Sequence, residues 1–441
     1  MRVIPAKQRG ETGEAANPPM GSLPGGDNFR QRALSPDPAA PIPAIFVRSP
    51  TWHPFLYRKR IDRADKARPG DLVAVYGPND LVLGYALYNP RSEIAARMVF
   101  YGDELPDDAA WQKKLGDAVE LRHGLLHLRD ATDAYRVIHA EADGLPGLVV
   151  DRLGDVLSAE AYTLGMYQRA EAILVRLATA LGTTHFAVRP SPQFLSQEGY
   201  EPLSLSSPGL PSEVTIREYG TRFRVRFAGG HKTGFFCDQR ENRKRLADFC
   251  EGRTVLDLCC YTGGFAVQAK RLGKAADVTG VDLDEEPLKL ARENANLNQA
   301  RVRFVQDDAF AYMREMLRLE RRYDVVVLDP PKLIRSRAEL EEGTRKHFDL
   351  NRLAMRLVKP GGLMLSCCCS GLLKEPDFVQ LLRQSAYQSG ELISAATEDI
   401  PERHAARPMQ ILARTGAAAD HPVSAAVPET EYLKAVWMRL G

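Results

Sequence analysis

Three consecutive cysteines, at positions 367, 368 and 369, follow an apolar run near the C-terminal end of the chain. Adjacent thiols could hold a metal ion, form disulfides, fill a buried strand end or supply a nucleophile. The spacing argues against a metal site, because there is no Cys-x-x-Cys pair and strand neighbours point to opposite faces. All the cysteines lie between Cys237 and Cys369, whereas a disulfide scaffold would spread them along the chain. We interpret Cys369, which precedes a Ser-Gly pair, as a nucleophile, and Cys367 and Cys368 as buried strand residues.

Acidic residues recur at the ends of successive apolar, β-branched segments. Asp257 lies in the first segment, Asp282 ends the second, and Asp307 and Asp308 follow the third. The carboxyl ends of parallel strands meet at one edge of a sheet, where doubly wound folds bind their ligands. Each acidic residue alone could simply cap the next helix. Acidic residues at the ends of three successive segments favour a bound adenosine, with Asp282 accepting the ribose hydroxyls and Asp308 near the adenine.

The loop after the first segment contains two adjacent glycines, Gly263 and Gly264. Glycines there let the backbone approach a ligand closely, and we expect Asp257 and Tyr261 beside the same part of it. The pattern is not G-x-G-x-x-G, so a dinucleotide fits poorly. Acidic strand ends without a phosphate-binding loop suit an adenosine that carries a sulfonium cation. The predicted cofactor is S-adenosylmethionine.

The fourth segment ends in Leu-Asp-Pro-Pro-Lys-Leu, with Asp329 before the prolines and Lys332 after them. Consecutive prolines cannot continue a strand and hold a rigid loop. Methyltransferases that act on exocyclic base amines typically place an aromatic residue after Pro-Pro, so Lys332 argues against that chemistry. A thiolate that adds to carbon 6 of a pyrimidine makes carbon 5 nucleophilic, which gives Cys369 a role. We expect Asp329 to face the N3/N4 edge of the base, and Lys332 to contact RNA or lower the pKa of the thiol.

The elements that must position these residues follow from the sequence pattern. From about residue 238 strands and helices alternate, which predicts a parallel, doubly wound α/β sheet. Two strand-like runs around Gly-Pro-Asn-Asp and a further strand predict a small β-rich domain over residues 44–115. Residues 116–228 mix strands with a helix and predict a central α+β domain. Residues 1–43 have almost no aliphatic periodicity and are expected to be disordered.

The bulk composition is that of an ordinary globular protein. Of 441 residues, 44% are hydrophobic and 26% charged, and the net charge of +2 confines any nucleic-acid surface to a local patch. The best candidate patch is residues 58–68, with Arg58, Lys59 and Arg60, although a solvated face is the simpler alternative. No apolar run approaches the ~20 residues of a membrane helix, and the N-terminus has no secretory pattern. The expected location is the cytoplasm.

Six segments carry a resemblance to one family: GHKTGFFCDQRENR, YTGGFAV, VLDPPKL, CCSGLL, DHPVSAAVPETEYLK and, upstream, EADGLPGLVVDR. They resemble the class I rRNA large-subunit methyltransferase I family, which makes 5-methylcytosine in 23S rRNA. The resemblance implies a PUA RNA-binding domain, a central α+β domain and a Rossmann-like methyltransferase domain over residues 229–441. The cysteine of the family's Ser-Cys-Ser-Gly motif falls on Cys369, and Cys368 replaces the serine before it.

The resemblance implies an S-adenosylmethionine-dependent rRNA cytosine-C5 methyltransferase with a cysteine nucleophile. Lys232, Gln239 and Arg240 are then candidates for cofactor or RNA contact, the alternative being a solvated helix start. Two rival functions stay open: an RNA methyltransferase acting on another base position, and a non-catalytic RNA-binding factor for ribosome assembly. The expected partner is ribosomal RNA, either free or in a partly assembled particle. The sequence leaves open whether the chain forms a homodimer.

Overall fold

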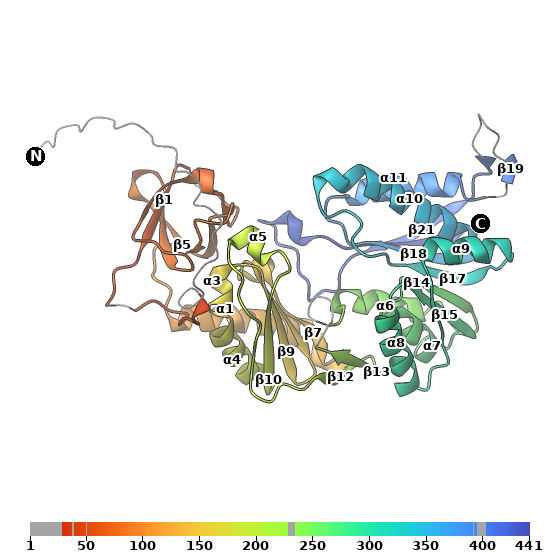
Figure 1. Cartoon of the computed structure of the whole chain (residues 1–441), viewed down its shortest axis with the longest axis horizontal. Coiled ribbons are helices and arrows are strands. Elements are labelled where there is room, and N and C mark those ends of the chain that lie inside the picture. Colours follow the sequence, from red (N-terminus) through yellow and green to blue (C-terminus); the bar gives the residue numbers. More distant parts are fainter. Residues whose placement is uncertain (1–28, 38, 50, 228–233, 391, 395–402) are drawn as a thin grey trace, which may run out of the picture.

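A computed structural model describes residues 29–37, 39–49, 51–227, 234–390, 392–394 and 403–441. The chain folds into three successive units, which follow one another from the N-terminal sheet at the left of Figure 1 to the C-terminal sheet at the right. Within the described ranges, no helix combines the length and the apolar character that crossing a membrane requires.

The N-terminal unit is one six-stranded sheet with the order β2-β6-β5-β4-β1-β3. Its strands are β1 (Ala44–Val47), β2 (Phe55–Leu56), β3 (Ile61–Asp65), β4 (Leu72–Tyr76), β5 (Val82–Tyr88) and β6 (Ala96–Tyr101). The predicted hairpin is β4–β5, and its turn places Asn79 and Asp80 at positive φ, a conformation that short polar side chains tolerate. Ile45, Val73 and Val75 are fully buried on one side of the sheet.

The segment before this sheet is ordered from residue 29, which corrects the expectation of disorder for its last part. Leu34 is only 2% exposed. The ring of Phe29 packs edge-on against Tyr167 at 6.3 Å, and Arg32 pairs with Asp71 at 2.5 Å. Two isolated apolar residues show no periodicity in the sequence, yet each fills a site on the folded body. Residues 1–28 lie outside the described residues.

The central unit combines a five-stranded sheet, a hairpin and helices. The sheet order is β11-β10-β9-β8-β7, and β12 pairs with β13. The strands are β7 (Ala134–His139), β8 (Leu148–Leu153), β9 (Val156–Ala161), β10 (His185–Pro190), β11 (Leu205–Ser206), β12 (Glu213–Glu218) and β13 (Thr221–Arg226). The helices are α1 (Asp108–Glu120), α2 (Leu128–Ala131), α3 (Leu164–Tyr167), α4 (Ala170–Leu181) and α5 (Phe194–Glu198).

The boundary expected at residue 115 falls inside α1. Trp111 and Leu115 on this helix are buried in one core together with Leu87 of the N-terminal sheet and Leu174 of α4. The first two units therefore share a hydrophobic core, and α1 belongs to both.

The C-terminal unit is a seven-stranded sheet with the order β16-β15-β14-β17-β18-β22-β21. The strands are β14 (Thr254–Leu258), β15 (Asp277–Asp282), β16 (Arg303–Gln306), β17 (Tyr323–Leu328), β18 (Val358–Cys368), β21 (Met409–Thr415) and β22 (Lys434–Leu440). The helices are α6 (Arg240–Ala247), α7 (Gly264–Arg271), α8 (Glu285–Leu297), α9 (Ala309–Arg318), α10 (Leu340–Arg356) and α11 (Glu375–Tyr387). A small pair, β19 (Leu392–Ser394) and β20 (Arg403–His404), lies beside it.

The strand directions explain where a ligand would bind. β16, β15, β14, β17 and β18 are mutually parallel, and β22 runs antiparallel between β18 and β21. Successive strands are added on one side of β14 as far as β16, and on its other side from β17 onward. The position between β14 and β17 is therefore the switch point of a doubly wound sheet. The five parallel carboxyl ends therefore meet at one edge, as the sequence predicted.

Candidate active site

Three carboxylates gather at the carboxyl edge of the parallel strands. Asp257 in β14 is 1% exposed, and its Oδ2 accepts a hydrogen bond of 2.9 Å from the backbone N of Ala266 on α7. Burial raises the pKa of Asp257 well above its usual range, and the charges of Asp329 and Asp282 raise it further. Oδ1 of Asp257 is buried and has no hydrogen-bond partner among the described residues. A buried anionic edge with an unmet acceptor suits a cationic ligand that carries N–H donors.

The loop between β14 and α7 brings backbone to the same edge. Tyr261, at φ 49°, donates its backbone N–H to Oδ2 of Asp282 over 2.8 Å. Gly263 has φ 80°, and a Cβ there would lie 3.0 Å from Cζ of Phe304 and 3.2 Å from the Cβ of Ala291. Only glycine meets both demands without strain, so the loop passes close to β16 and α8. The predicted close approach of this loop to a ligand stays a prediction.

The two remaining acidic candidates differ in their surroundings. Asp282 ends β15 half-buried, and its Oδ1 also accepts a backbone N–H, from Asp284 at 3.1 Å. Asp308 is exposed and caps α9, with Oδ1 accepting the N–H of Ala311 at 3.0 Å. The helix-capping alternative therefore applies to Asp308 through its Oδ1. The roles of Asp282 and Asp308 toward a cofactor stay predictions.

We expect Asp282→Ala to weaken S-adenosylmethionine binding about 10- to 150-fold, because a charge-assisted hydrogen bond is worth about 1.5–3 kcal/mol. Calorimetric titration of the full chain measures the change. Asp284→Ala is the matched control: Asp284 is exposed two residues away and caps α8 through a 3.0 Å bond to the N–H of Glu286. Equal affinities for the wild type and Asp282→Ala would remove Asp282 from the cofactor site.

The three cysteines occupy three different environments. Cys367 and Cys368 are fully buried, Cys367 in the core with Phe265 and Cys368 in the opposite core with Phe378. Cys369 follows the strand and is partly exposed, with its Sγ 4.0 Å from the carbonyl oxygen of Pro330. The predicted alternation of faces is thus confirmed, and Cys369 alone of the three is both accessible and beside the Asp-Pro-Pro loop.

The buried thiol of Cys368 lies next to a histidine. Sγ of Cys368 lies 3.6 Å from Nε2 of His347 on α10. Burial raises the pKa of Cys368 and lowers the pKa of His347 to about 4. Cys368 is 0% exposed and His347 is 1% exposed. A nucleic-acid base therefore cannot reach this pair in this structure.

Gln239 and Arg240, expected to contact cofactor or RNA, are both buried. Nε2 of Gln239 donates to Oδ2 of Asp329 over 3.0 Å, and its Oε1 accepts from Asn242 over 2.7 Å. Gln239 therefore holds the predicted catalytic carboxylate. The guanidinium of Arg240 is 0% exposed and donates to both oxygens of Asp420, at 3.0 and 2.8 Å. This corrects the expectation for Arg240, whose charge is neutralised inside the protein.

The partner of Arg240 also joins two units of the fold. Asp420 accepts the backbone N–H of Arg136 on β7 over 2.7 Å, and its carbonyl oxygen accepts from Arg122 over 2.8 Å. The partners of the Arg240–Asp420 ion pair are 180 residues apart, so the pair leaves no local sequence signal. The hydrogen bonds from Arg136 and Arg122 to Asp420 fix the central unit to the C-terminal unit, and removing Arg240 would leave an uncompensated buried charge.

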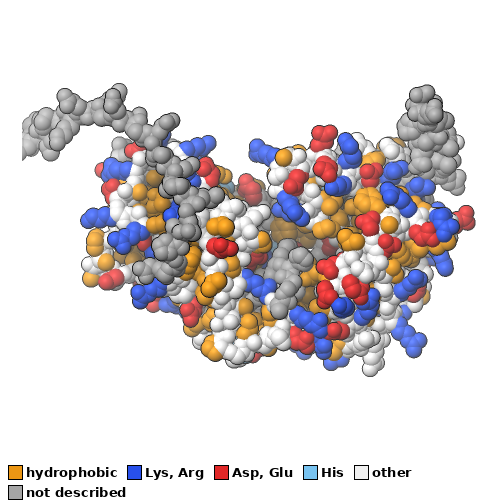
Figure 2. Space-filling model, viewed as in Figure 1, with side chains coloured by type: hydrophobic (Ala, Val, Ile, Leu, Met, Phe, Trp, Pro, Cys, Tyr) orange, Lys and Arg blue, Asp and Glu red, His pale blue; other side chains and the backbone are white. Residues whose placement is uncertain are grey.

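The remaining basic candidates are Lys332, Lys232 and the segment Arg58–Arg60. Lys332 is exposed after the two prolines. Lys232 lies outside the described residues. Arg58–Arg60 form a short 3₁₀ turn, in which Arg58 and Lys59 are exposed and Arg58 donates to the carbonyl oxygen of Arg91 over 2.9 Å. Figure 2 shows Lys and Arg interspersed with Asp and Glu over this face of the molecule, in keeping with the near-neutral net charge.

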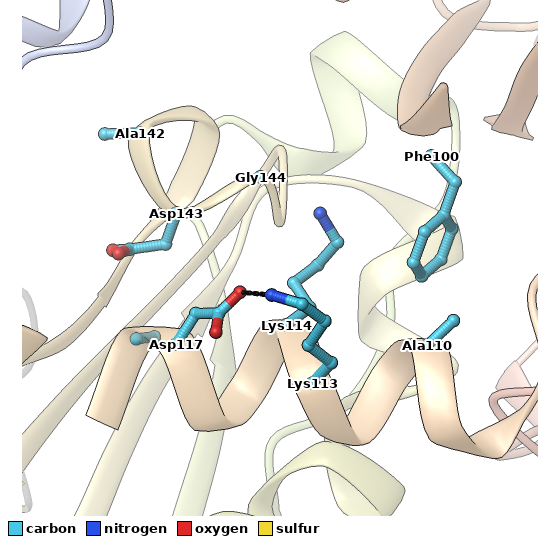
Figure 3. Close-up of a pocket in the computed structure, with 9 residues that line it drawn as sticks. Phe100, Ala110, Lys113, Lys114, Asp117, Ala142, Asp143 and Gly144 are labelled. Atoms are coloured by element: carbon cyan, nitrogen blue, oxygen red, sulfur yellow. Dashed lines mark hydrogen bonds and ion pairs between the residues drawn. The ribbon is translucent and has the colours of Figure 1, made fainter. Parts of the chain in front are cut away.

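A pocket of about 460 Å³ lies elsewhere, between α1 and the turn after β7 (Figure 3). Lys114 extends across it, with its Nζ 4.9 Å above the ring of Phe100, and Lys113 pairs with Asp117 at 2.6 Å. Burial lowers the pKa of Lys114. None of the residues that line this pocket is one of the predicted site residues.

Numbered along the chain, the seven strands have the order 3-2-1-4-5-7-6, and carboxylates and a glycine-bearing loop occupy the carboxyl edge. This arrangement defines a class I S-adenosylmethionine-dependent methyltransferase. A family model described as S-adenosylmethionine-dependent methyltransferase matches residues 149–409, and one described as PUA-like domain matches residues 51–100. The chain belongs to the ribosomal RNA large subunit methyltransferase I family, as the following relatives demonstrate.

Curated relatives from several bacteria carry that name, and two of them serve as examples. The protein of Aeromonas hydrophila is 35% identical over 396 residues, covering 88% of this chain and 95% of its own. The protein of Photobacterium profundum is 34% identical over 390 residues, covering 87% and 94%. Among solved structures, an S-adenosylmethionine-dependent methyltransferase from Streptococcus mutans superimposes with a TM-score of 0.71 at 19% identity, covering 90% of this chain and 100% of its own. A methyltransferase complexed with SAH gives a TM-score of 0.70 at 20% identity, covering 88% and 95%. These likenesses establish the fold.

Proposed function

We propose that this protein transfers a methyl group from S-adenosylmethionine to carbon 5 of a cytosine in large-subunit ribosomal RNA, with Cys369 as the nucleophile. One observation carries the proposal. Cys369 is the partly exposed thiol at the end of the fifth strand, and its Sγ lies 4.0 Å from the Pro330 carbonyl oxygen, directly after Asp329. The thiol thus lies beside the loop that carries Asp329, and this proximity supports pyrimidine C5 chemistry with these two groups.

The chemistry assigns each group a task. The Cys369 thiolate forms a bond to carbon 6 of the base as the C5–C6 π bond opens, and Asp329 in its protonated form donates a proton to the N3/N4 edge, which takes up the displaced electron density; the proton returns to Asp329 when the ring is restored. Carbon 5 then takes the methyl group, which S-adenosylmethionine supplies as an electrophile when bound. Loss of the carbon-5 proton to a base expels the thiolate and restores the ring. Cysteine suits both ends of this sequence because it is a good nucleophile and a good leaving group. The target base must be single-stranded or flipped out of a helix.

The cofactor would lie along the carboxyl edge of β14, β15 and β16. Asp257, Tyr261, Gly263 and Gly264 would surround its methionine part, and Asp282 and Asp308 its ribose and adenine. The cluster of Asp257, Asp282 and Asp329 supports this placement, because repulsion among the three carboxylates is relieved by a cation. The unpartnered Oδ1 of Asp257 supplies an acceptor for an N–H donor.

The test of the function is the identity of the modified base. Purified protein, large-subunit rRNA and S-adenosylmethionine with an isotopically labelled methyl group are incubated, and the RNA is digested to nucleosides for mass spectrometry. We expect labelled 5-methylcytidine. A label on another base position would support the first rival enzyme, and no labelled nucleoside from free or partly assembled RNA would support the assembly factor.

RNA binding by the N-terminal unit is part of the proposal, and we expect replacement of Arg58, Lys59 and Arg60 by Ala to weaken the salt dependence of RNA affinity. Each lost phosphate contact should reduce the slope of log affinity against log salt by up to ~0.7 for single strands. Fluorescence anisotropy at several salt concentrations gives the slope.

A matched control removes three positive charges far from this unit, at the exposed end of α9 and just after it: Arg318, Arg321 and Arg322. The net charge of the two triple variants is the same, so only the place of the charges differs. If both triples change the slope equally, the 3₁₀ turn is an ordinary solvated segment and makes no phosphate contact.

A further inference from the structure

Lys434 is a buried lysine at the start of β22 that is not among the residues predicted from the sequence. Only 6% of it is exposed, although lysines are almost never buried without a charged partner. β22 pairs antiparallel with β18, and this register sets Lys434 directly opposite Cys368. β22 therefore brings a cation next to Cys368, at the end of the strand that Cys369 follows.

The ammonium group is held by backbone oxygens. Nζ donates to the carbonyl oxygen of Ser370 over 2.6 Å and to that of Tyr432 over 2.9 Å. A lysine ammonium has three N–H donors, and backbone oxygens of the described residues accept two of them. No carboxylate in the described part of the chain lies within ion-pair distance of Nζ. Ser370 directly follows Cys369, so the first bond anchors the charge at the backbone next to Cys369.

The charged and titratable groups around this lysine come from several elements. They are Cys368 in β18, Cys369 after it, His347 on α10, Lys374 before α11 and Glu431 before β22. Burial lowers the pKa of Lys434, and the thiols of Cys368 and Cys369 act in the opposite direction. Cys368 is completely buried, so the thiol that can ionise next to this cation is the accessible one.

We propose that Lys434 is the positioning residue that keeps Cys369 in its reactive thiolate form. The proposal deepens the proposed function and rests on it. The ammonium of Lys434 stabilises the thiolate before the base binds, and it stabilises the same thiolate again when the Sγ–C6 bond breaks. Lys332, the cation that the sequence suggested for this task, is exposed, and solvent and salt screen an exposed charge far more than a buried one.

The test measures the thiolate itself, without RNA or cofactor. The full-chain protein is alkylated with iodoacetamide over a range of pH, and modification at Cys369 is followed by mass spectrometry. We expect Lys434→Met to raise the midpoint of this profile by about 1 pH unit or more, because an adjacent opposite charge typically shifts a pKa by about 1–3 units. The alkylation rate at neutral pH should fall roughly tenfold.

Two further variants separate charge from structure. Lys434→Gln keeps a side-chain N–H for the Ser370 carbonyl but has no charge, and it should raise the midpoint as Lys434→Met does. Lys434→Arg restores a cation and should return the midpoint toward the wild-type value. Lys332→Met tests the rival cation. An unchanged midpoint in a folded neutral variant at position 434, or a larger shift in Lys332→Met, overturns the proposal.

The pH profile of methyl transfer distinguishes a failure of this proposal from a failure of the proposed function. The pH profile of methyl transfer in Lys434→Gln should move to higher pH in parallel with the alkylation midpoint, so that activity lost at neutral pH returns at alkaline pH. A merely structural role would lower activity equally at every pH. If Cys369→Ala still methylates while the alkylation midpoint shifts as expected, the nucleophile assignment is wrong and the Lys434–Cys369 pairing stands.

Discussion

Replacing Cys369 by Ala should abolish methyl transfer and leave the affinity for S-adenosylmethionine nearly unchanged. The thiol is the group that forms the bond to carbon 6, and without that bond carbon 5 is too weak a nucleophile to take a methyl group. The cofactor carboxylates belong to other strand ends, so the substitution removes no cofactor contact that we propose. Single-turnover methylation of large-subunit rRNA and calorimetric titration measure the two effects separately.

The matched controls are the two neighbouring thiols. Cys367→Ser and Cys368→Ser should retain activity and lose stability, because each places a hydroxyl in a fully buried site, where an unsatisfied polar group costs about 1–3 kcal/mol. Thermal unfolding gives the stability change. Activity that depends on Cys368 and not on Cys369 would mean that the buried thiol beside His347 becomes accessible during the reaction.

A trapped adduct identifies the nucleophile directly. RNA with 5-fluorocytosine at the target should form a covalent complex with the wild type, since fluorine cannot leave carbon 5 as a proton does. The three cysteines are consecutive, so digestion gives one peptide with all of them, and the linked residue must be located by fragmentation within that peptide. Attachment at Cys368 would contradict the assignment of Cys369.

The carboxyl edge was predictable because it depends on local patterns. Apolar, β-branched segments followed by acidic residues placed Asp257, Asp282 and Asp329 at one edge of the sheet, and the parallel register brings them together as expected. The alternation of side chains along a strand likewise placed Cys367 and Cys368 on opposite faces, and these residues lie in two different cores.

The parts that were missed depend on long-range pairing. Arg240 meets Asp420 across 180 positions, whereas its place in a basic segment before a helix predicted contact with cofactor or RNA, with a solvated helix start as the alternative. Lys434 reaches the cysteines only because β22 inserts antiparallel next to β18. A short stretch of sequence shows neither the register of two distant strands nor the partner of a buried charge, because both follow from how distant elements pack. Phe29 likewise carries no periodicity, yet its ring packs against Tyr167.

Asp329→Asn should lower the rate of methyl transfer by about 10²- to 10⁴-fold, the range typical for a removed acid–base group. The amide is almost the same shape as the carboxylate, and its oxygen can still accept the hydrogen bond that Gln239 donates to Oδ2. What it removes is the negative charge and the ability to exchange a proton with the N3/N4 edge of the base. The effect should therefore fall on the rate at saturating RNA more than on RNA affinity. Single-turnover rates over a range of RNA concentrations separate these two quantities.

Asp324→Asn is the matched control, because Asp324 lies near the start of β17, whereas Asp329 directly follows the end of that strand. Its carboxylate accepts from the backbone N and hydroxyl of Thr254, at 2.9 and 2.7 Å, and pairs with Lys359 at 2.9 Å, and these bonds lower its pKa to about 2 against the opposing effect of burial. A depressed pKa in the folded state contributes stability above the unfolded-state pKa, which is lost as pH falls toward 2. Asp324→Asn should thus reduce stability at neutral pH and leave the methyl-transfer rate unchanged. If Asp329→Asn kept the wild-type rate, or if both variants slowed methyl transfer equally, the carboxylate at the Pro-Pro loop would have no chemical role, and stabilisation of the adduct would have to come from another group at this edge.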